Sequence, residues 1–302
     1  MPKVRSDDVP TGPVPVARGP AARRRSRRGR LLRTLLALVV VLGLAGLGLA
    51  LVLKAGGGAG GIGLPLPSSS ESDPLLPGAP TITVPPPAAP ARVTGPGYDV
   101  SYPQCRSTLP AGAAFGIVGV NGGAPLTSNR CFAEQIAWAQ RTGRYAVYIN
   151  TSNSGAKDPV AYGRKLADDA IRRERAAGVS GIGVWWLDVE LTNTWRGTQQ
   201  ENATVLAAMA ARLQEAGVRV GIYSSPQQWQ EIAGDWAPGL PVWNATGPGT
   251  QVAALRACTE EFAGSTTAIV QWVAAKGSRQ LDHNLVCPAW RDRAGDLLDV
   301  TP

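Results

Sequence analysis

Residues 181–191 read GIGVWWLDVEL, and this stretch decides the fold expected for the chain. The apolar run after the two glycines is typical of a strand buried on both faces. Because side chains alternate along a strand, Trp186, Asp188 and Glu190 share one face. The stretch therefore predicts a buried strand that ends in two carboxylates beside an indole ring. An isolated D-x-E also fits a solvated acidic loop, so the rest of the chain has to decide between the two.

Strand-like runs alternate with amphipathic helical runs from residue 98 onward. The expected strands are Tyr98–Ser101, Phe115–Val120, Tyr145–Asn150, Val184–Asp188, Arg219–Ser224, Pro241–Ala245, Ala268–Trp272 and Leu281–Val286. The helical patterns between them cover Phe132–Arg141, Pro159–Ala177 and Gln199–Ala216. Repeated strand and helix units favour parallel strands joined by crossovers, so eight strands predict an α/β fold, a (β/α)8-type TIM-like barrel. In such barrels, carboxylates at the carboxyl ends of strands are typical of catalytic residues.

The net charge of +8 comes from the first part of the chain alone. Residues 1–34 carry ten basic and two acidic residues, whereas the remainder carries 20 of each kind. A nucleic-acid-binding domain therefore finds no support in the rest of the chain, where a basic patch would have to lie.

Thr34 to Leu53 is a run of twenty uncharged, mostly apolar residues, long enough to span a bilayer. A signal peptide is the competing interpretation, but its apolar core is usually shorter, and no small-x-small cleavage site follows. Seven arginines lie between Arg23 and Arg33, and Lys54 alone follows closely. The positive-inside rule therefore predicts a basic cytoplasmic tail at 1–33, a single transmembrane helix at 34–53, and an extracytoplasmic remainder. The expected location is the cell membrane.

Residues 54–96 are rich in Gly, Ser and Pro, as in GGGAGGIG and TVPPPAAPAR, which predicts a disordered linker between the membrane and a barrel domain at 97–302.

All four cysteines follow this linker. An even number in an oxidising compartment predicts two disulfides, and of the three pairings we prefer Cys105 with Cys131 and Cys258 with Cys287, since each closes a short loop. A zinc site is disfavoured because no C-x-x-C spacing occurs and His283 is the only histidine. Nothing in the sequence indicates a metal or organic cofactor.

Three further segments share strand ends with the opening stretch: GYDVSYPQC (97–105), IVQWV (269–273) and LDHN (281–284). With Asp188 and Glu190 they resemble the motifs of glycoside hydrolase family 25, the muramidases that cut peptidoglycan. That family pattern has D-x-S-x-x-Q on the first strand, D-x-E on a central strand, Q-Y or Q-W next, and D-x-N last. The matching residues are Asp99, Ser101, Gln104, Asp188, Glu190, Gln271, Trp272, Asp282 and Asn284. The likeness runs from Gly97 to Cys287 and includes GIYSS (221–225) and PVW (241–243).

Glycoside hydrolysis needs a proton donor and a second carboxyl role. Neighbouring charge and burial beside Trp186 should raise the pKa of Glu190, the expected general acid, whereas Asp188 should stay ionised. The residues alone fit Asp188 either as a nucleophile or as a group that orients the substrate's N-acetyl group. The resemblance implies retention with help from the N-acetyl group. The expected substrate-binding residues are Asp99, Asn121, Trp186, Tyr223, Trp243, Gln271, Trp272, Asp282 and Asn284. Strand alternation turns His283 to the opposite face, which predicts a structural role.

Two segments depart from the family pattern. After the second strand the chain reads VNGG (120–123), where the family usually has a charged or larger polar residue. The third strand ends YINTSNSG (148–155), where the family typically places an aromatic residue of the sugar cleft. The four strand-end carboxylates in family order nevertheless make an anchored glycoside hydrolase acting on peptidoglycan the leading hypothesis. The alternatives are a barrel that binds cell-wall glycan without cutting it, and an inert structural tether.

Overall fold

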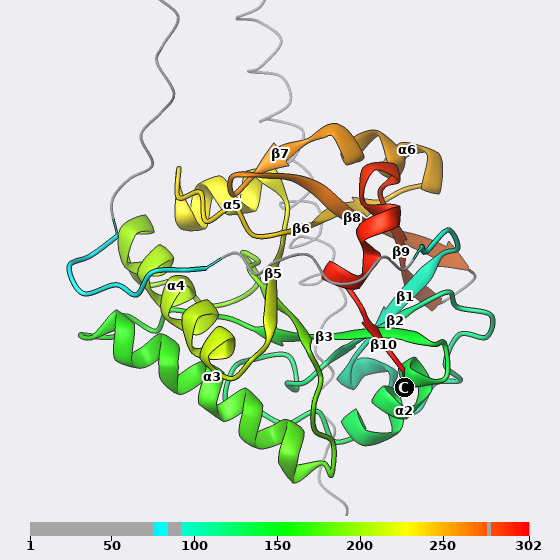
Figure 1. The fold of residues 1–302 in the computed structure, drawn as a ribbon, viewed down its shortest axis with the longest axis horizontal. Helices are drawn as coiled ribbons and strands as arrows, with labels where there is room; N and C mark the ends of the chain where they lie inside the picture. The colour runs from blue at the N-terminus through cyan, green and yellow to red at the C-terminus, as the bar shows by residue number, and fades with distance from the viewer. Residues whose placement is uncertain (1–74, 84–91, 277–278, 302) are drawn as a thin grey trace, which may run out of the picture. The chain divides into compact units, whose positions relative to one another are not determined.

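The computed structural model describes residues 75–83, 92–276 and 279–301 (Figure 1). The predicted tail at 1–33 and the predicted membrane span at 34–53 lie outside these residues. None of the helices within the described ranges is long and apolar enough to cross a membrane.

Eight strands form a closed barrel at the centre of the described part (Figure 1). They are β1 (Gly97–Val100), β2 (Gly116–Gly119), β3 (Arg144–Asn150), β4 (Val184–Asp188), β5 (Arg219–Ser224), β6 (Val242–Pro248), β8 (Ser265–Lys276) and β9 (Arg279–Val286). The ring closes because β3 pairs with β4 and β9 pairs with β1. Each strand lies where the sequence predicted one, and the fold is a TIM-like barrel.

The last barrel strand runs against the expected direction. Strands β1 to β6 and β8 are parallel, but β9 is antiparallel to both β8 and β1. Lys276 pairs with Arg279, so only two residues join the strands. A parallel connection needs a crossover of about a dozen residues or more, and the expectation of eight parallel strands was therefore wrong for β9. The reversal puts the amino-terminal part of β9, with Asp282, at the same barrel end as the carboxyl ends of the others.

Helices cover the outside of the barrel. They are α2 (Phe132–Gln140), α3 (Pro159–Ala176), α4 (Gln199–Glu215), α5 (Pro226–Ala233) and α6 (Gln251–Arg256). The Asp158 side chain caps α3, and Thr198 with Glu201 forms a capping box on α4. Gly178 and Gly217 follow the two helices with φ of 72° and 82°, a conformation that favours glycine and stops a helix.

Short elements complete the described part. They are the 3-10 helices η2 (Tyr102–Gln104), η3 (Ala257–Thr259) and η4 (Pro288–Asp296), and the two-residue strands β7 (Glu261–Phe262) and β10 (Asp299–Val300). β7 pairs with β8, and β10 pairs with β3.

The core has two layers that follow the alternation of β4. Trp185 and Leu187 point outward into the layer beneath the helices, whereas Val184 and Trp186 fill the barrel interior. The ring of Trp186 lies so close to β5 that a Cβ on Gly221 would be 2.4 Å from it. Glycine at 221 therefore makes room for the indole at the barrel centre.

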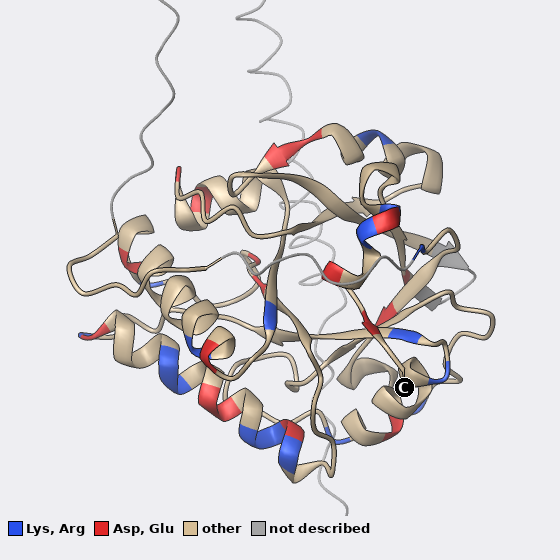
Figure 2. Ribbon diagram, viewed as in Figure 1, with Lys and Arg blue, Asp and Glu red and all other residues tan. Residues whose placement is uncertain are grey.

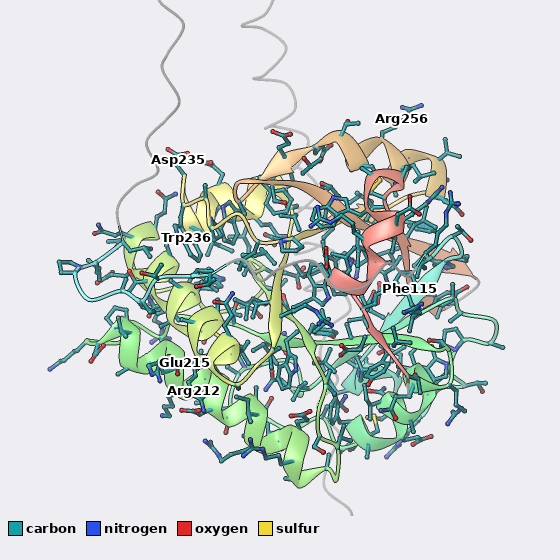
Figure 3. The ribbon with its side chains drawn as sticks, viewed as in Figure 1. Phe115, Arg212, Glu215, Asp235, Trp236 and Arg256 are labelled. Atoms are coloured by element: carbon teal, nitrogen blue, oxygen red, sulfur yellow. A yellow bond between two sulfur atoms is a disulfide. The ribbon has the colours of Figure 1, made fainter. Side chains whose placement is uncertain are left out.

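Charges of both signs are spread along α3 and α4 (Figure 2). Arg164 on α3 donates to both carboxylate oxygens of Glu215 at 2.7 and 2.8 Å, and Arg212 pairs with Asp168 at 2.7 Å. Figure 3 shows Arg212 and Glu215 on the part of α4 that lies beside α3. The basic residues of these two helices are thus matched by acidic ones, in line with the balanced charge outside the tail.

Both predicted disulfides, Cys105–Cys131 and Cys258–Cys287, are confirmed. Cys105–Cys131 ties the segment after β1 to the start of α2. A part of the predicted linker also contacts the barrel, because the Leu76 amide donates to Thr204 Oγ1 on α4 at 3.2 Å. The side chain of Gln214 accepts from the backbone N–H of Thr83 and donates to its carbonyl oxygen.

Candidate active site

A pocket of about 380 Å³ opens at the barrel end where the parallel strands finish. Every barrel strand except β2 contributes at least one residue to the pocket lining. Glu190 and Gln228 come from segments that follow β4 and β5. The lining residues are Asp99, Tyr148, Asp188, Glu190, Tyr223, Gln228, Trp243, Ala245, Gly247, Gln271, Val273 and Asp282. The structure therefore brings four carboxyl groups into one cavity, together with three of the predicted polar and aromatic residues.

Asp188 ends β4 and points into the pocket from its floor, with only 3% of its surface exposed. Asn150 is its partner in the β3–β4 register, and the Asn150 side-chain amide donates to Asp188 Oδ2. Thr151 and Asn193 donate to the Asp188 backbone carbonyl. Burial raises the pKa of Asp188 well above its usual range, and the neighbouring charge of Glu190 acts in the same direction.

Glu190 lies two residues further along and is half-buried, so it reaches the open part of the pocket. Its backbone is held by Trp195 Nε1, which donates to the Glu190 carbonyl at 2.8 Å, and by the Asn193 amide at 3.0 Å. Gln228 on α5 accepts from the Leu191 amide at 2.8 Å beside it. Burial raises the pKa of Glu190 and the charge of Asp282 adds to this, while hydrogen bonds from nearby side chains oppose the rise.

Asp188 and Glu190 interact directly, and both have raised pKa values. The sequence predicted a raised pKa for Glu190 alone, so the raised pKa of Asp188 was not expected. The physical reason is depth, because Asp188 is the more deeply buried of the two and pays the larger desolvation cost when it is charged. Ionising both of two close carboxyls is unfavourable. Between the pKa values of the first and second ionisation, the pair therefore binds one proton.

Asp99 is fixed by a chain of hydrogen bonds across the barrel. Its Oδ2 accepts from Asn284 Nδ2 at 2.7 Å and from Gln271 Nε2 at 2.9 Å. Trp243 Nε1 donates to Asn284 Oδ1, and Tyr223 donates its hydroxyl proton to Gln271 Oε1, each at 2.8 Å. These outer bonds orient both amides so that their N–H groups face the carboxylate. Asp99 is thus held rigidly at the pocket wall.

Asp282 faces Asp99 across the β1–β9 pairing, where only a reversed β9 can place it. Burial raises the pKa of Asp99 well above its usual range, and the charge of Asp282 adds to this effect. Burial also raises the pKa of Asp282 itself. All four carboxyls of the pocket therefore favour the neutral form more than free carboxyls do.

Comparison with known proteins finds similarity to lysozymes. A family model described as Lysozyme-like protein 1 matches residues 120–257, which include Asp188 and Glu190. The probable GH family 25 lysozymes 4 and 2 of Dictyostelium discoideum are both 35% identical, over 74 and 68 residues. The barrel is similar to the family 25 lysozymes. These alignments cover 24% and 22% of this chain, and the chain spans about a third of the length of each relative (34% and 32%).

The chain is also similar to a solved structure. It is a glycosyl hydrolase 25 of Streptococcus pneumoniae, described as a virulence factor that participates in host cell invasion. It is 19% identical, covers 67% of this chain and 93% of its own, and superimposes with a TM-score of 0.48.

Four predicted substrate-binding residues do not line the pocket of this barrel. Trp272 lies on the outer face of β8, where its ring stacks on His283 with centroids 5.1 Å apart. Trp186 is fully buried inside the barrel, with its ring centroid 5.8 Å from that of Trp243. Asn284 positions Asp99, as described above. The side-chain oxygen of Asn121 accepts from the backbone N–H of Asn150 at 3.0 Å and so supports the end of β3.

His283 has the structural role predicted for it. Its side chain packs between Trp272 and Tyr98 on the outside of the barrel, with a ring distance of 4.7 Å to Tyr98. Burial lowers its pKa, so the imidazole stays neutral more readily than a free one.

Tyr148, Asn150 and Gln228 are site residues that the sequence reasoning missed. Tyr148 lines the pocket, so the third strand does supply an aromatic ring, from within the strand rather than after it. The alternation of side chains along β3 could have identified Tyr148 and Asn150. The two residues share one face of the strand and pair with Trp186 and Asp188. Gln228 gives no such signal, because it comes from the first turn of α5 and reaches Glu190 only in the folded barrel.

Proposed function

We propose that this barrel is a glycoside hydrolase that cleaves the glycan strands of peptidoglycan, with Glu190 as the general acid. The observation that carries the proposal is the pair of interacting carboxyls, Asp188 and Glu190, with raised pKa values at the floor of a pocket. A glycosidase needs one carboxyl that keeps a proton near neutral pH and a second that acts ionised. The similarity to family 25 lysozymes supports peptidoglycan as the substrate.

In the proposed reaction the productive form has the shared proton on Glu190, the more accessible member. Glu190 gives this proton to the glycosidic oxygen as the bond from that oxygen to the anomeric carbon breaks. Ionised Asp188, held by Asn150, orients the N-acetyl group of the substrate, whose carbonyl oxygen bonds to the anomeric carbon. Water then displaces that oxygen and returns a proton to Glu190, so the configuration is retained.

The test uses the purified full-length chain with purified cell wall, and it measures new reducing ends from about pH 4 to 7, a window around carboxyl pKa values. Glu190→Gln should lower the rate by about 10² to 10⁴, the usual contribution of a general acid. Glu134→Gln is the matched control, because Glu134 is exposed on α2 away from the pocket and its replacement should change nothing. Absence of cleavage by the wild type would remove the hydrolase proposal.

The second candidate function is recognition of wall glycan without cleavage, and the glycine-rich VNGG loop favours it because this side of the site departs from the family pattern. A pull-down of wall glycan by Glu190→Gln, combined with no turnover by the wild type, would support this function. Turnover by the wild type would exclude it. An inert tether predicts neither binding nor cleavage.

We further propose that residues 34–53 anchor the chain in the cell membrane, with the N-terminus cytoplasmic and the barrel outside. The charge asymmetry around this apolar run supports the orientation. The two disulfides support an oxidising compartment for the barrel. Protease added to intact cells should digest the barrel and spare an N-terminal tag, and protection of the barrel would contradict this orientation.

A further inference from the structure

The pocket has one side to which the barrel contributes no side chain, and this side lies over β2. The last residue of β2 is Gly119, and the space for its side chain is already filled. A Cβ there would be 2.7 Å from Ser101 Cβ and 2.7 Å from the ring of Tyr148, which lines the pocket. The rim above β2 is therefore formed by the loops that follow β1 and β2.

These two loops carry an aromatic ring that the proposed reaction does not use. Tyr102 is the first residue of η2, directly after β1, and 46% of its surface is exposed. The ring lies against Gly123 in the loop after β2, where a Cβ would be 2.5 Å from Tyr102 Cε1. Gly123 also has a φ of 87°, which favours glycine. Gly123 of the VNGG segment thus packs against the Tyr102 ring, and much of the ring stays exposed to solvent.

We infer that Tyr102, supported by Gly123, is a stacking platform that extends the pocket over β2 and binds a further sugar unit of the glycan strand. This inference rests on the proposed function for its ligand. A polymer threaded through a pocket of about 380 Å³ has to leave it over some part of the rim. β2 and the loop after it offer no side chain of their own at positions 119, 122 and 123, which are glycines.

A sugar fits this ring better than a protein partner does. Tyrosine offers an apolar face to the C–H groups of a pyranose and keeps a hydroxyl for water or a sugar hydroxyl. A protein partner would need a contiguous apolar patch of a few hundred Å². The chain neighbours of Tyr102, Ser101 and Pro103, and its contact residue Gly123 present no large apolar side chain.

The test compares Tyr102→Ala and Tyr102→Phe in the full-length chain, with Val252→Ala on α6 as an exposed apolar control. The probes are purified peptidoglycan and a tetrasaccharide of alternating N-acetylglucosamine and N-acetylmuramic acid. Tyr102→Ala should raise KM for the polymer roughly two- to tenfold, the range for stacking on an aromatic ring, and leave kcat within about twofold. Tyr102→Phe, which keeps the ring face, should behave like the wild type. An unchanged KM in Tyr102→Ala would overturn the inference.

Equilibrium binding of the tetrasaccharide to Glu190→Gln separates this inference from the proposed function. Adding Tyr102→Ala to that variant should weaken binding by the same roughly two- to tenfold. If the wild type does not cleave but this loss is seen, the hydrolase proposal fails and the platform stands. If the wild type cleaves and neither KM nor binding depends on the ring, the platform fails alone. If no binding occurs, both fail.

Discussion

The side-chain amide of Asn150 should set the acidic limb of the pH profile, because it donates to Asp188 Oδ2. Asn150→Leu keeps the size of the side chain and removes the donor. A hydrogen bond to a charged group contributes about 1.5–3 kcal/mol, and one pKa unit corresponds to about 1.36 kcal/mol. The pKa of Asp188, already raised by burial, should therefore rise by about a further one to two units.

Because the proposed reaction needs Asp188 ionised and Glu190 protonated, activity is lost as the pH falls and the pair takes up its second proton. In Asn150→Leu this loss should begin one to two pH units higher, as estimated above from the hydrogen bond. The assay is kcat/KM for purified peptidoglycan measured from about pH 4 to 8, a range set by ordinary carboxyl and histidine pKa values. The alkaline limb, which reports the loss of the proton from Glu190, should move less.

Thr151→Val provides the matched control for this experiment. Thr151 is the neighbouring buried residue, and its hydroxyl donates to the backbone carbonyl of Asp188 rather than to the carboxylate. This variant should lose stability without moving the acidic limb. An acidic limb that stays in place in Asn150→Leu, or moves equally in both variants, would refute the role of the Asn150 amide.

Two further predictions concern stability. Asp188 has a folded-state pKa above its ordinary value of 3.8, so ionisation opposes folding and its destabilising effect grows as the pH rises above that value. Asp188→Asn should therefore raise Tm at pH 7 by at least about 2–4 °C, as expected for about 1 kcal/mol, and the gain should vanish near pH 4 in thermal unfolding scans. Gly221→Ala should destabilise the barrel by about 1–3 kcal/mol, because the added Cβ would lie 2.4 Å from the Trp186 ring. An unchanged urea midpoint would show that the ring has room to move.

Alternation along strands explains both a success and a mistake of the sequence reasoning. It placed Asp188 and Glu190 on one face of β4, and both line the pocket. The same rule shows that Gln271 and Trp272, as neighbours in one strand, cannot both face inward. Gln271 faces Asp99 and Trp272 faces outward, so Trp272 does not line the pocket as the sequence predicted.

Depth within the barrel escaped prediction for a different reason. Trp186 shares a face with Asp188, but it lies one pleat further from the mouth and is sealed inside by Trp243. The periodicity of a sequence predicts on which face of a strand a side chain lies, but not how far that side chain is from the mouth of the barrel. The pKa direction of Asp188 depends on the same quantity, because burial is the largest cause of its rise.

The sequence by itself determined the eight strands and the positions of the acidic residues at strand ends, since these follow from local periodicity. Short loops favoured the observed cysteine pairs among three possible pairings. Only the tertiary structure decided that β9 runs backwards and so sets Asp282 opposite Asp99. Only the tertiary structure placed Tyr102 over Gly123 and Gln228 beside Glu190. The reversal of β9 follows from its two-residue connection to β8, which is visible only once the ends of both strands are known. The other relations join segments that are distant in the chain and depend on strand pairing and burial.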